Sequence, residues 1–422
     1  MLRPVHRARR AWLAGFVLWL LAGAAAAEGM LVVAGGAVRA DNAEVFEAFI
    51  DALPDPEGTI AVISAASGSP VGSAQDFVET LGRYGVAAER VVTIELSVTD
   101  DSETEFDERN WAGNADDPDE IAKLSGVSGV WFTGGDQRRI AEVLLSDDGK
   151  ATPMLDAIRA RHAAGAVIGG TSAGAAIMSN PMITGGEPIV ALLGGTVDGD
   201  ALTMDIGLGF FAPGLVDQHF DARARLGRVV VALGVFDQKR RFAIGVDEDT
   251  AFVYSPDDAL LAVVGSSNVT LVDGREATWR KVSERIAIDG LSVSVLSPGD
   301  RFSLADGSYR PAKYLKPTVG NEYNDHQVVA GGGAAMPSVA LSRMLGEELL
   351  DNRGARELER VTLVASSEET SAGVLYRFVQ SEDSHGFWGR DGDGRPRYSV
   401  IGVVFDVVPL TVAITPIQSP DP

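Results

Sequence analysis

The stretch AVIGGTSAGAAIMS, residues 166–179, decides the fold and the chemistry of this chain. Its apolar start predicts a buried strand, the glycines around Ser172 predict a sharp turn, and the small residues that follow predict a helix. Gly170, Ser172 and Gly174 have the spacing of a nucleophile elbow, in which glycines allow a strained turn that exposes a serine hydroxyl. We therefore predict that Ser172 is a nucleophile and that the N–H of Ala173, at the helix start, binds an oxyanion. The alternative is a glycine-rich turn that binds phosphate or only packs closely.

The first 27 residues have the pattern of a secretory signal peptide. Arginines precede an apolar stretch at 11–23 that is shorter than a membrane span, and Ala25 to Ala27 supply a small-residue cleavage site. We predict cleavage after Ala27 and a secreted or periplasmic protein that has no membrane attachment afterwards. A retained N-terminal anchor is the alternative.

The chain is acidic and contains no cysteine. Its net charge of −23 argues against nucleic acid and anionic membranes as partners. The lack of cysteine excludes disulfides, thiol catalysis and cysteine-based zinc sites, and we expect no metal or other cofactor. A length of 422 residues predicts two domains, or one large domain with an appendage. The oligomeric state stays open, with a homodimer among the alternatives.

Short apolar runs alternate with helical patterns in the first half of the chain. Strands are predicted at 30–34, 59–64, 90–95 and 129–133, with a helix at 74–85 between the second and third. This alternation predicts βαβ units and an α/β fold whose mostly parallel sheet is flanked by helices. Ligands of such sheets bind beyond the carboxyl ends of the strands. Residues 100–120 are polar and acidic, and we interpret them as a solvated surface loop.

A glycine pair follows the strand predicted at 129–133. Gly134 and Gly135 allow a ligand to approach main-chain N–H groups closely, so Gly135 is a natural second oxyanion donor. Asp136 is interpreted as the N-cap of the next helix.

A serine nucleophile needs a base, and His219 is the best candidate among the histidines that follow the signal segment. His162 lies in a helix-like run and is interpreted as a surface residue, whereas His326 and His385 lie in polar loops. Arg223 follows His219 by four residues, so in a helix both side chains would lie on one side. A base beside a guanidinium group suits an anionic substrate end.

The third member of such a site is a carboxylate that orients the imidazole ring. Glu187 is the preferred candidate because it follows the glycine-containing loop at 183–186. Asp198, Asp200, Asp205 and Asp217 are open alternatives.

Three motifs together give the chain a family resemblance: FTGGDQ at 132–137, GGTSAGAA at 169–176 and VDQHFDARARLGR at 216–228. In this order and spacing they resemble cyanophycinases, serine peptidases related to aspartyl dipeptidase. The resemblance covers about residues 28–305 and includes the segments at 247–251 and 297–301. It implies a class I glutamine amidotransferase-like fold. It also implies hydrolysis of cyanophycin, a poly-aspartate whose β-carboxyl groups carry arginine, to β-Asp-Arg dipeptides.

The same resemblance implies roles for individual residues. Ser172 would be the nucleophile, His219 the base, and Glu187, which follows the matching segment 182–186, the acid. Substrate contacts would come from Gln137, Asp217, Gln218, Arg223, Arg225 and Arg228. An exported aspartyl dipeptidase and a non-catalytic polymer-binding protein on the same scaffold are the alternative functions.

Residues 306–422 lie outside this resemblance. Strand-like runs at 361–364, 375–379 and 398–408, with a hairpin tip at 387–395, predict a β-rich C-terminal region of unknown role. Asp391 and Asp393 lack the further ligands of a calcium loop and therefore predict a turn. The predicted organisation is a signal peptide at 1–27, a peptidase domain at 28–305 and this C-terminal region.

Overall fold

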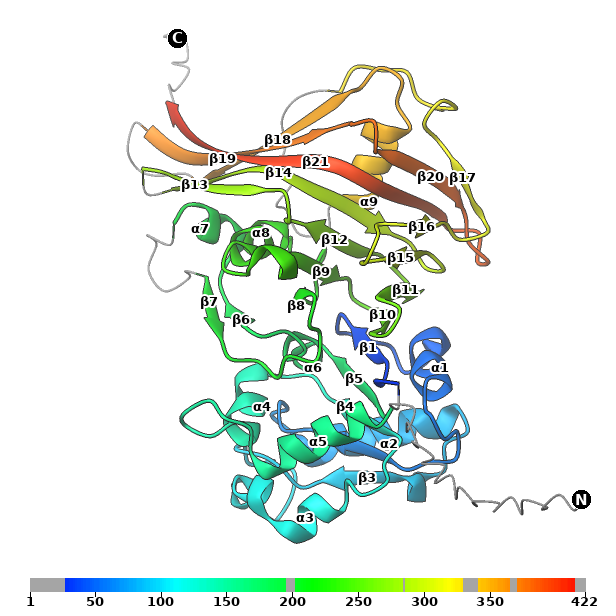
Figure 1. Cartoon of the computed structure of the whole chain (residues 1–422), viewed down its shortest axis with the longest axis vertical. Helices are drawn as coiled ribbons and strands as arrows, with labels where there is room; N and C mark the ends of the chain where they lie inside the picture. The colour runs from blue at the N-terminus through cyan, green and yellow to red at the C-terminus, as the bar shows by residue number, and fades with distance from the viewer. Residues whose placement is uncertain (1–26, 195–201, 284, 329–340, 365–369, 414–422) are drawn as a thin grey trace, which may run out of the picture.

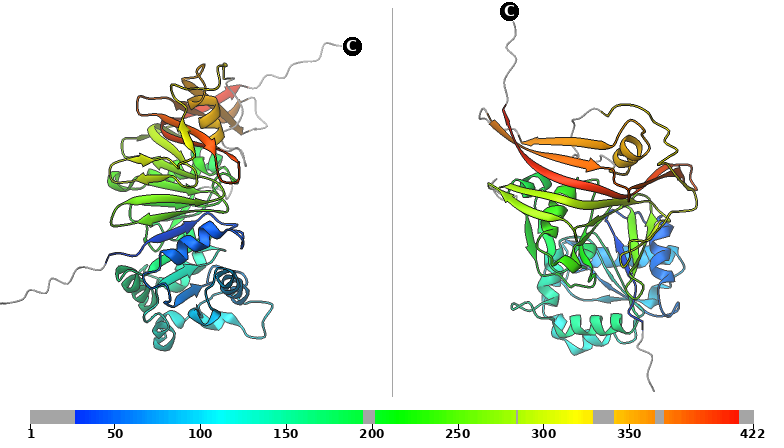
Figure 2. Two further views of the ribbon diagram at one scale, coloured as in Figure 1. Left: turned by 90° about the vertical axis from the view of Figure 1, so that its right-hand side faces the viewer. Right: turned by 45° about the horizontal axis from the view of Figure 1, so that its top comes forward.

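A computed structural model describes residues 27–194, 202–283, 285–328, 341–364 and 370–413. Within these ranges the chain forms two large sheets that stack along the long axis of the molecule (Figure 1). Figure 2 shows the order of the layers, with the C-terminal strands at one end and the N-terminal helices at the other. Residues 1–26 lie outside the described residues, so the signal peptide stays a prediction.

The first sheet is mixed, with strand order β16-β15-β11-β10-β1-β5-β4-β2-β3. Its parallel part confirms the strands predicted from the apolar runs, and its antiparallel part is added by the chain after residue 249. The α/β class is confirmed, although only half of the sheet is parallel. The parallel strands are β1 (Leu31–Ala34), β2 (Ile60–Ile63), β3 (Val91–Ile94), β4 (Gly129–Phe132) and β5 (Val167–Thr171). The antiparallel strands are β10 (Thr250–Ser255), β11 (Leu260–Gly265), β15 (Arg301–Ser303) and β16 (Tyr309–Arg310).

Helices cover both faces of this sheet because alternate side chains of each buried strand point to opposite sides. On one face, Val32 and Trp131 pack with α1 (Ala43–Asp51) and α2 (Pro70–Arg83). On the other, Leu31 and Phe132 pack with α4 (Gln137–Leu144) and α5 (Pro153–Ala163). The other helices are α3 (Pro118–Ala122), α6 (Ala173–Ala176), α7 (Pro188–Leu192), α8 (Leu226–Leu233), α9 (Leu341–Arg343), a π-helix (Met344–Leu350) and 3₁₀ turns at 88–90, 108–111, 114–116 and 238–240.

The second sheet joins the C-terminal region to the rest of the chain. Its main path is β17-β20-β21-β14-β12-β9-β8, and β21 pairs directly with β14. The boundary predicted at residue 305 therefore does not coincide with a break between sheets. These strands are β8 (Gly214–Asp217), β9 (Phe242–Val246), β12 (Val269–Asp273), β13 (Thr278–Val282), β14 (Arg285–Leu296), β17 (Leu315–Pro317), β18 (Glu357–Val364), β19 (Thr370–Val379), β20 (His385–Arg390) and β21 (Pro396–Ala413). A separate small pair is formed by β6 (Met182–Gly185) and β7 (Thr203–Asp205).

One sequence interpretation is wrong, and another holds only in part. Residues 100–120 are mostly exposed, as expected, but Asp101, Glu108 and Glu120 are buried and accept hydrogen bonds, for example from the Ser69 hydroxyl to Asp101 at 2.8 Å. His162 is buried rather than on the surface, and its ring packs edge-on against that of Phe210. Hydrogen bonds from residues distant in the chain, such as Ser69 to Asp101 and Glu95 to Glu120, allow these carboxylates to be buried in a way that hydropathy does not predict.

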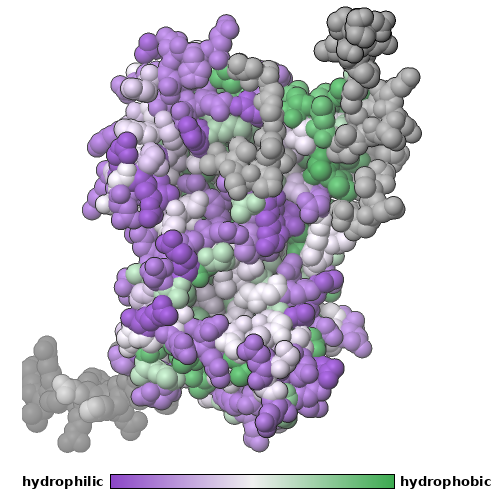
Figure 3. All heavy atoms as spheres, turned by 180° about the vertical axis from the view of Figure 1, so that it is seen from behind, coloured by the Kyte–Doolittle hydropathy of each residue, from purple (hydrophilic) through white to green (hydrophobic). Residues whose placement is uncertain are grey.

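Most of the described surface visible from behind is hydrophilic, with the largest apolar patch at the upper right of the view and smaller ones scattered below it (Figure 3). No helix in the described ranges combines the length and apolar character needed to span a membrane. The hairpin predicted at 387–395 is present, but residues 387–390 belong to β20 and the turn to β21 is 391–395, in which the Asp391 carboxylate accepts from the N–H groups of Asp393 and Arg395.

Candidate active site

Ser172 lies at the sharp turn between β5 and α6. Its backbone angles are φ 54° and ψ −109°, a strained conformation for a residue with a side chain. A Cβ atom on Gly170 would lie 2.4 Å from the carbonyl oxygen of Gly174, and one on Gly174 would lie 2.3 Å from that of Phe132. Glycine is therefore required on both sides of the serine, and the strand, turn and helix have the predicted elbow geometry.

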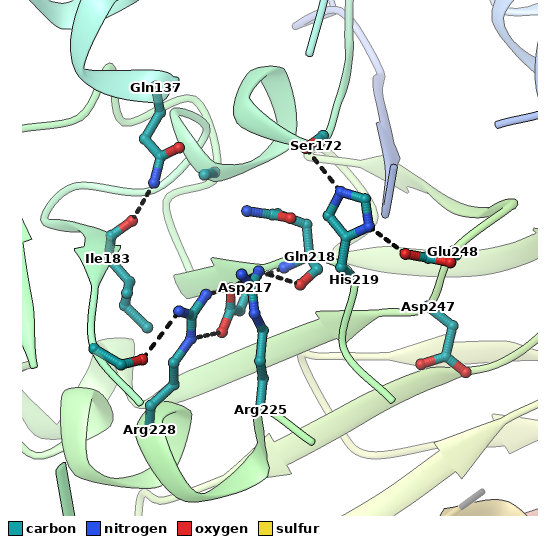
Figure 4. Close-up of polar contacts among 12 residues, drawn as sticks. Gln137, Ser172, Ile183, Asp217, Gln218, His219, Arg225, Arg228, Asp247 and Glu248 are labelled. Carbon is teal, nitrogen blue, oxygen red and sulfur yellow. Dashed lines mark hydrogen bonds and ion pairs between the residues drawn. The ribbon is translucent and has the colours of Figure 1, made fainter. Parts of the chain in front are cut away.

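Ser172, His219 and Glu248 form a continuous hydrogen-bonded chain (Figure 4). The Ser172 hydroxyl oxygen lies 3.0 Å from Nε2 of His219, and Nδ1 of the same ring lies 2.6 Å from Oε1 of Glu248. When Nδ1–H donates to the Glu248 carboxylate, Nε2 is left as an acceptor for the serine proton. This is the geometry of a serine nucleophile with its base and an orienting acid.

The sheets bring these residues together although they are far apart in the chain. Strands β1 and β5 are parallel neighbours in the first sheet, and β8 and β9 are parallel neighbours in the second. Ser172 follows β5, His219 lies two residues beyond β8, and Glu248 lies two residues beyond β9. The site therefore lies at the carboxyl ends of parallel strands, at the junction of the two sheets.

Glu248, and not Glu187, is the carboxylate against His219, so the Glu187 prediction is corrected. Glu187 is exposed at the start of α7, and its charge acts on Arg225. The open alternatives are also elsewhere: Asp217 pairs with arginines, Asp205 is exposed on β7, and Asp198 and Asp200 lie outside the described residues.

Glu248 comes after the histidine in the chain, so a search between serine and histidine misses it. One signal for it is present in the sequence, because the acidic residues 247–249 directly follow the apolar strand FAIGV at 242–246. A carboxylate just past the end of a buried strand is well placed for a site at that edge of the sheet.

The environment of His219 favours its neutral form. Burial lowers the pKa of His219, the hydrogen bond to Glu248 opposes this effect, and the nearby charge of Arg223 adds to the lowering. An imidazole with a lowered pKa is mostly unprotonated at pH 7 and can accept a proton from serine.

Two main-chain N–H groups are available beside the serine. A Cβ on Gly134 would lie 3.3 Å from that of Ser172, so the turn between β4 and α4 passes directly beside the nucleophile. In the part of the chain that the structure describes, the N–H groups of Gly135 and Ala173 donate no hydrogen bond to another residue. Both predicted oxyanion donors are therefore unpaired N–H groups, although Ala173 is fully buried.

Asp217, Arg225 and Arg228 form a buried ionic cluster next to this site. Arg228 donates from Nε and Nη2 to the two carboxylate oxygens of Asp217, at 2.7 and 2.6 Å, and Arg225 approaches one of them at 3.3 Å. Burial opposes ionisation of Asp217, which is 2% exposed, but the two arginines outweigh it and lower its pKa. The cluster carries one net positive charge.

The remaining predicted contact residues differ in burial and in their hydrogen-bond partners. Gln137 is buried and donates from Nε2 to the carbonyl oxygen of Ile183 at 2.8 Å. Gln218 is also buried, and its Oε1 has no hydrogen-bond partner among the described residues. Figure 4 shows its side chain between Gln137 and His219. Arg223 is exposed. An unpaired buried acceptor is unfavourable, so Gln218 would gain from a ligand that donates to its Oε1, and the exposed guanidinium group of Arg223 is accessible to a ligand.

The chain is similar to known peptidases over most of its length. Residues 30–262 match the model of Peptidase family S51. The cyanophycinase of Trichormus variabilis is 32% identical over 289 residues, covering 67% of this chain and 88% of that protein. The cyanophycinase of Geminocystis herdmanii is 31% identical over 280 residues, covering 65% and 93%. The crystal structure of a peptidase from an acI-B1 actinobacterium aligns with a TM-score of 0.42 at 20% identity, covering 58% of this chain and 91% of that one.

Proposed function

This chain belongs to peptidase family S51 and is a serine-type peptidase, and on that premise we propose that it is an exported enzyme that hydrolyses cyanophycin to β-Asp-Arg dipeptides. The relatives named cyanophycinase support the substrate. The observation that carries the mechanism is the chain of two hydrogen bonds from Ser172 through His219 to Glu248.

In the first half of the proposed reaction, the Ser172 hydroxyl oxygen attacks an aspartyl main-chain carbonyl carbon while Nε2 of His219 takes the hydroxyl proton. The carbonyl oxygen becomes an oxyanion that accepts hydrogen bonds from the N–H groups of Gly135 and Ala173. His219 then gives its proton to the leaving amine, the carbon–nitrogen bond breaks, and an ester to Ser172 remains.

In the second half, water attacks this ester and His219 takes a proton from the water molecule. The ester bond breaks, the proton returns to the Ser172 oxygen, and the acid product leaves. Glu248 keeps the Nδ1 proton in place and stabilises the imidazolium ion that forms in each half. The reaction consumes one water molecule and needs no cofactor.

The substrate presents both carboxylate and guanidinium groups, and the site offers partners for both. The buried cluster of Asp217, Arg225 and Arg228 supplies a net positive charge, and exposed Arg223 adds a third guanidinium that can bind a carboxylate in a bidentate manner. Buried Oε1 of Gln218 is an acceptor for a guanidinium or amide N–H. We expect ordinary α-linked peptides, which lack the β-linked arginine, to be poor substrates.

Export is part of the proposal and rests on the N-terminal sequence. Sequencing the N-terminus of the protein recovered from periplasm or medium tests it. We expect Glu28 as the first residue, and an intact Met1 in a membrane fraction would contradict export without retention.

A substrate panel tests the function. The purified mature protein is incubated with cyanophycin, with β-Asp-Arg and α-Asp-Arg dipeptides, and with a general protease substrate such as casein. Dipeptide release from the polymer alone supports the proposal. Cleavage of the free dipeptides instead indicates an aspartyl dipeptidase, and retention on the polymer without any product indicates a non-catalytic binding protein.

A further inference from the structure

Asp247 stands directly before Glu248 but faces the other way. The Glu248 side chain meets His219, whereas that of Asp247 turns away from it (Figure 4). Asp247 is 5% exposed, and burial raises the pKa of its carboxyl group. A buried carboxylate this close to the reacting groups must be satisfied by neighbours, and those neighbours identify its role.

The Asp247 carboxylate links three separate segments. One oxygen accepts from the N–H of Asp221 at 3.1 Å, in the turn that carries His219. The other accepts from the Ser267 hydroxyl at 2.8 Å and from the N–H of Asn268 at 3.1 Å, in the turn between β11 and β12. Because Asp247 adjoins Glu248, this single side chain ties the turn that carries the base to the turn that carries the acid.

The turn that carries His219 needs such support. His219 has φ 47° and Ala224 has φ 50°, in the left-handed region that side chains disfavour. Strain of this kind persists only where surrounding contacts enforce it. Two main-chain bonds contribute, from the His219 N–H to Gly35 and from the Phe220 N–H to the Val246 carbonyl oxygen, at 2.7 and 3.1 Å.

The C-terminal region contacts the hydrogen-bonded group formed by Asp247, Asp221, Ser267 and Asn268. Asn268 donates from its side chain to the Ser342 hydroxyl at 3.0 Å. Asp221, Asp247 and Leu341 line one small cavity. Residues 341–342 lie beyond the part of the chain that matches the peptidase family, which ends at residue 262.

We propose that Asp247 is a positioning residue of this peptidase, which holds the His219 turn against Glu248, and that Leu341 and Ser342 of the C-terminal region brace the same cluster. The inference rests on the proposed roles of His219 and Glu248. It gives a structural reason for the C-terminal extension: residues 341 and 342, at the start of α9, support the turn that holds the base. Loss of the Asp247 hydrogen bonds leaves Ser172, His219 and Glu248 present but allows the distances between their side chains to change.

The test compares Asp247→Ala and Asp247→Asn with a matched control, Asp300→Ala. Asp300 is 0% exposed and also accepts three hydrogen bonds, from the N–H groups of Ser297 and Ala312 and the Ser399 hydroxyl, but it contacts neither turn. All variants are assayed at a temperature where near-ultraviolet circular dichroism shows them folded. The readouts are kcat and KM on cyanophycin, the rate at which a fluorophosphonate labels Ser172, and the downfield NMR signal of the His219 Nδ1 proton.

We expect Asp247→Ala to lower both kcat and the labelling rate by about 10- to 100-fold, because a misplacement of about 1 Å can cost this much. KM should stay within about threefold of wild type, the Nδ1 signal should weaken or disappear, and Asp247→Asn should give an intermediate loss. Asp300→Ala should match wild type in all three readouts. Equal kcat in Asp247→Ala and Asp300→Ala, or an unchanged Nδ1 signal in Asp247→Ala, would overturn the inference.

Failure of the proposed role of His219 gives a different result. If His219 is not the base, His219→Ala, assayed beside these variants, keeps the wild-type labelling rate and turnover, whatever the result for Asp247→Ala. If the wild type labels at Ser172 but does not cleave cyanophycin, the substrate is wrong, and the labelling rate and the NMR signal still decide the role of Asp247.

Discussion

Replacing Glu248 by Gln probes the contact that the sequence alone does not reveal. The carboxylate accepts the Nδ1 proton of His219 at 2.6 Å and so leaves Nε2 as an acceptor for the Ser172 hydroxyl. A glutamine amide can instead donate to Nδ1, which places the ring proton on Nε2 and removes its ability to take the serine proton. The change also removes the negative charge that stabilises the imidazolium ion.

The size of the effect follows from these two losses. A hydrogen bond to a charged group contributes about 1.5–3 kcal/mol, which corresponds to roughly 10- to 150-fold in rate. The wrong tautomer adds to this and reaches about 10⁴-fold where the acid is fully buried. Because the Glu248 side chain is 42% exposed, water screens its charge and can replace part of the contact. We expect a fall of about 10²- to 10³-fold in kcat, with KM within threefold.

The assay is the initial rate of dipeptide release from cyanophycin, measured over a range of substrate concentrations. Glu187→Gln is the matched control, because Glu187 is an exposed carboxylate whose charge acts on Arg225 but which does not contact His219. Its kcat should stay within about threefold of wild type. If Glu248→Gln kept wild-type kcat, or if Glu187→Gln lost as much, the assignment of Glu248 as the orienting acid would be refuted.

Three further outcomes are expected. Gly36→Ala should reduce activity by at least about tenfold, because its Cβ would lie 2.3 Å from Nε2 of His219 and must displace the ring. Wild-type activity in this variant would show that the reaction does not need the imidazole ring in this position. In a profile of kcat/KM against pH, the midpoint of the acid limb should lie below the ordinary imidazole pKa of about 6.5, because burial lowers the pKa of His219. Since the hydrogen bond to Glu248 raises that pKa, Glu248→Gln should move the limb to lower pH, and a move to higher pH would be inconsistent with this contact. Asp217→Asn leaves buried Arg228 without its counter-charge and should lower the free energy of unfolding by about 3–5 kcal/mol in urea titrations, whereas a loss under about 1 kcal/mol would argue against a buried ion pair.

The elements that the sequence predicts best are those that local patterns encode. The buried strands of the parallel part and the turn at Ser172 follow from apolar runs and glycine spacing, and the structure has them at nearly the predicted positions. His219 can be singled out because only four histidines follow the signal segment, and of these only His219 directly precedes an arginine-rich segment.

The parts that the sequence does not reveal depend on contacts between distant segments. Glu248 meets His219 only because β8 and β9 run side by side, and no local pattern states that pairing. The pairing of β21 with β14 likewise merges the C-terminal region with the second sheet across more than 100 residues of chain. The burial of His162 cannot be predicted from the local sequence because it depends on packing against Phe210, nearly 50 residues away in the chain.

Release of β-Asp-Arg from insoluble cyanophycin by the mature protein and by Ser172→Ala, quantified side by side by chromatography, tests whether this chain is a cyanophycin hydrolase that uses Ser172. We expect the wild type to release the dipeptide and the variant to be slower by more than about 10⁴-fold, because removal of the nucleophile disables the triad as a unit. Equal release by both proteins would contradict the role of Ser172, and no release by a folded wild type would contradict the substrate.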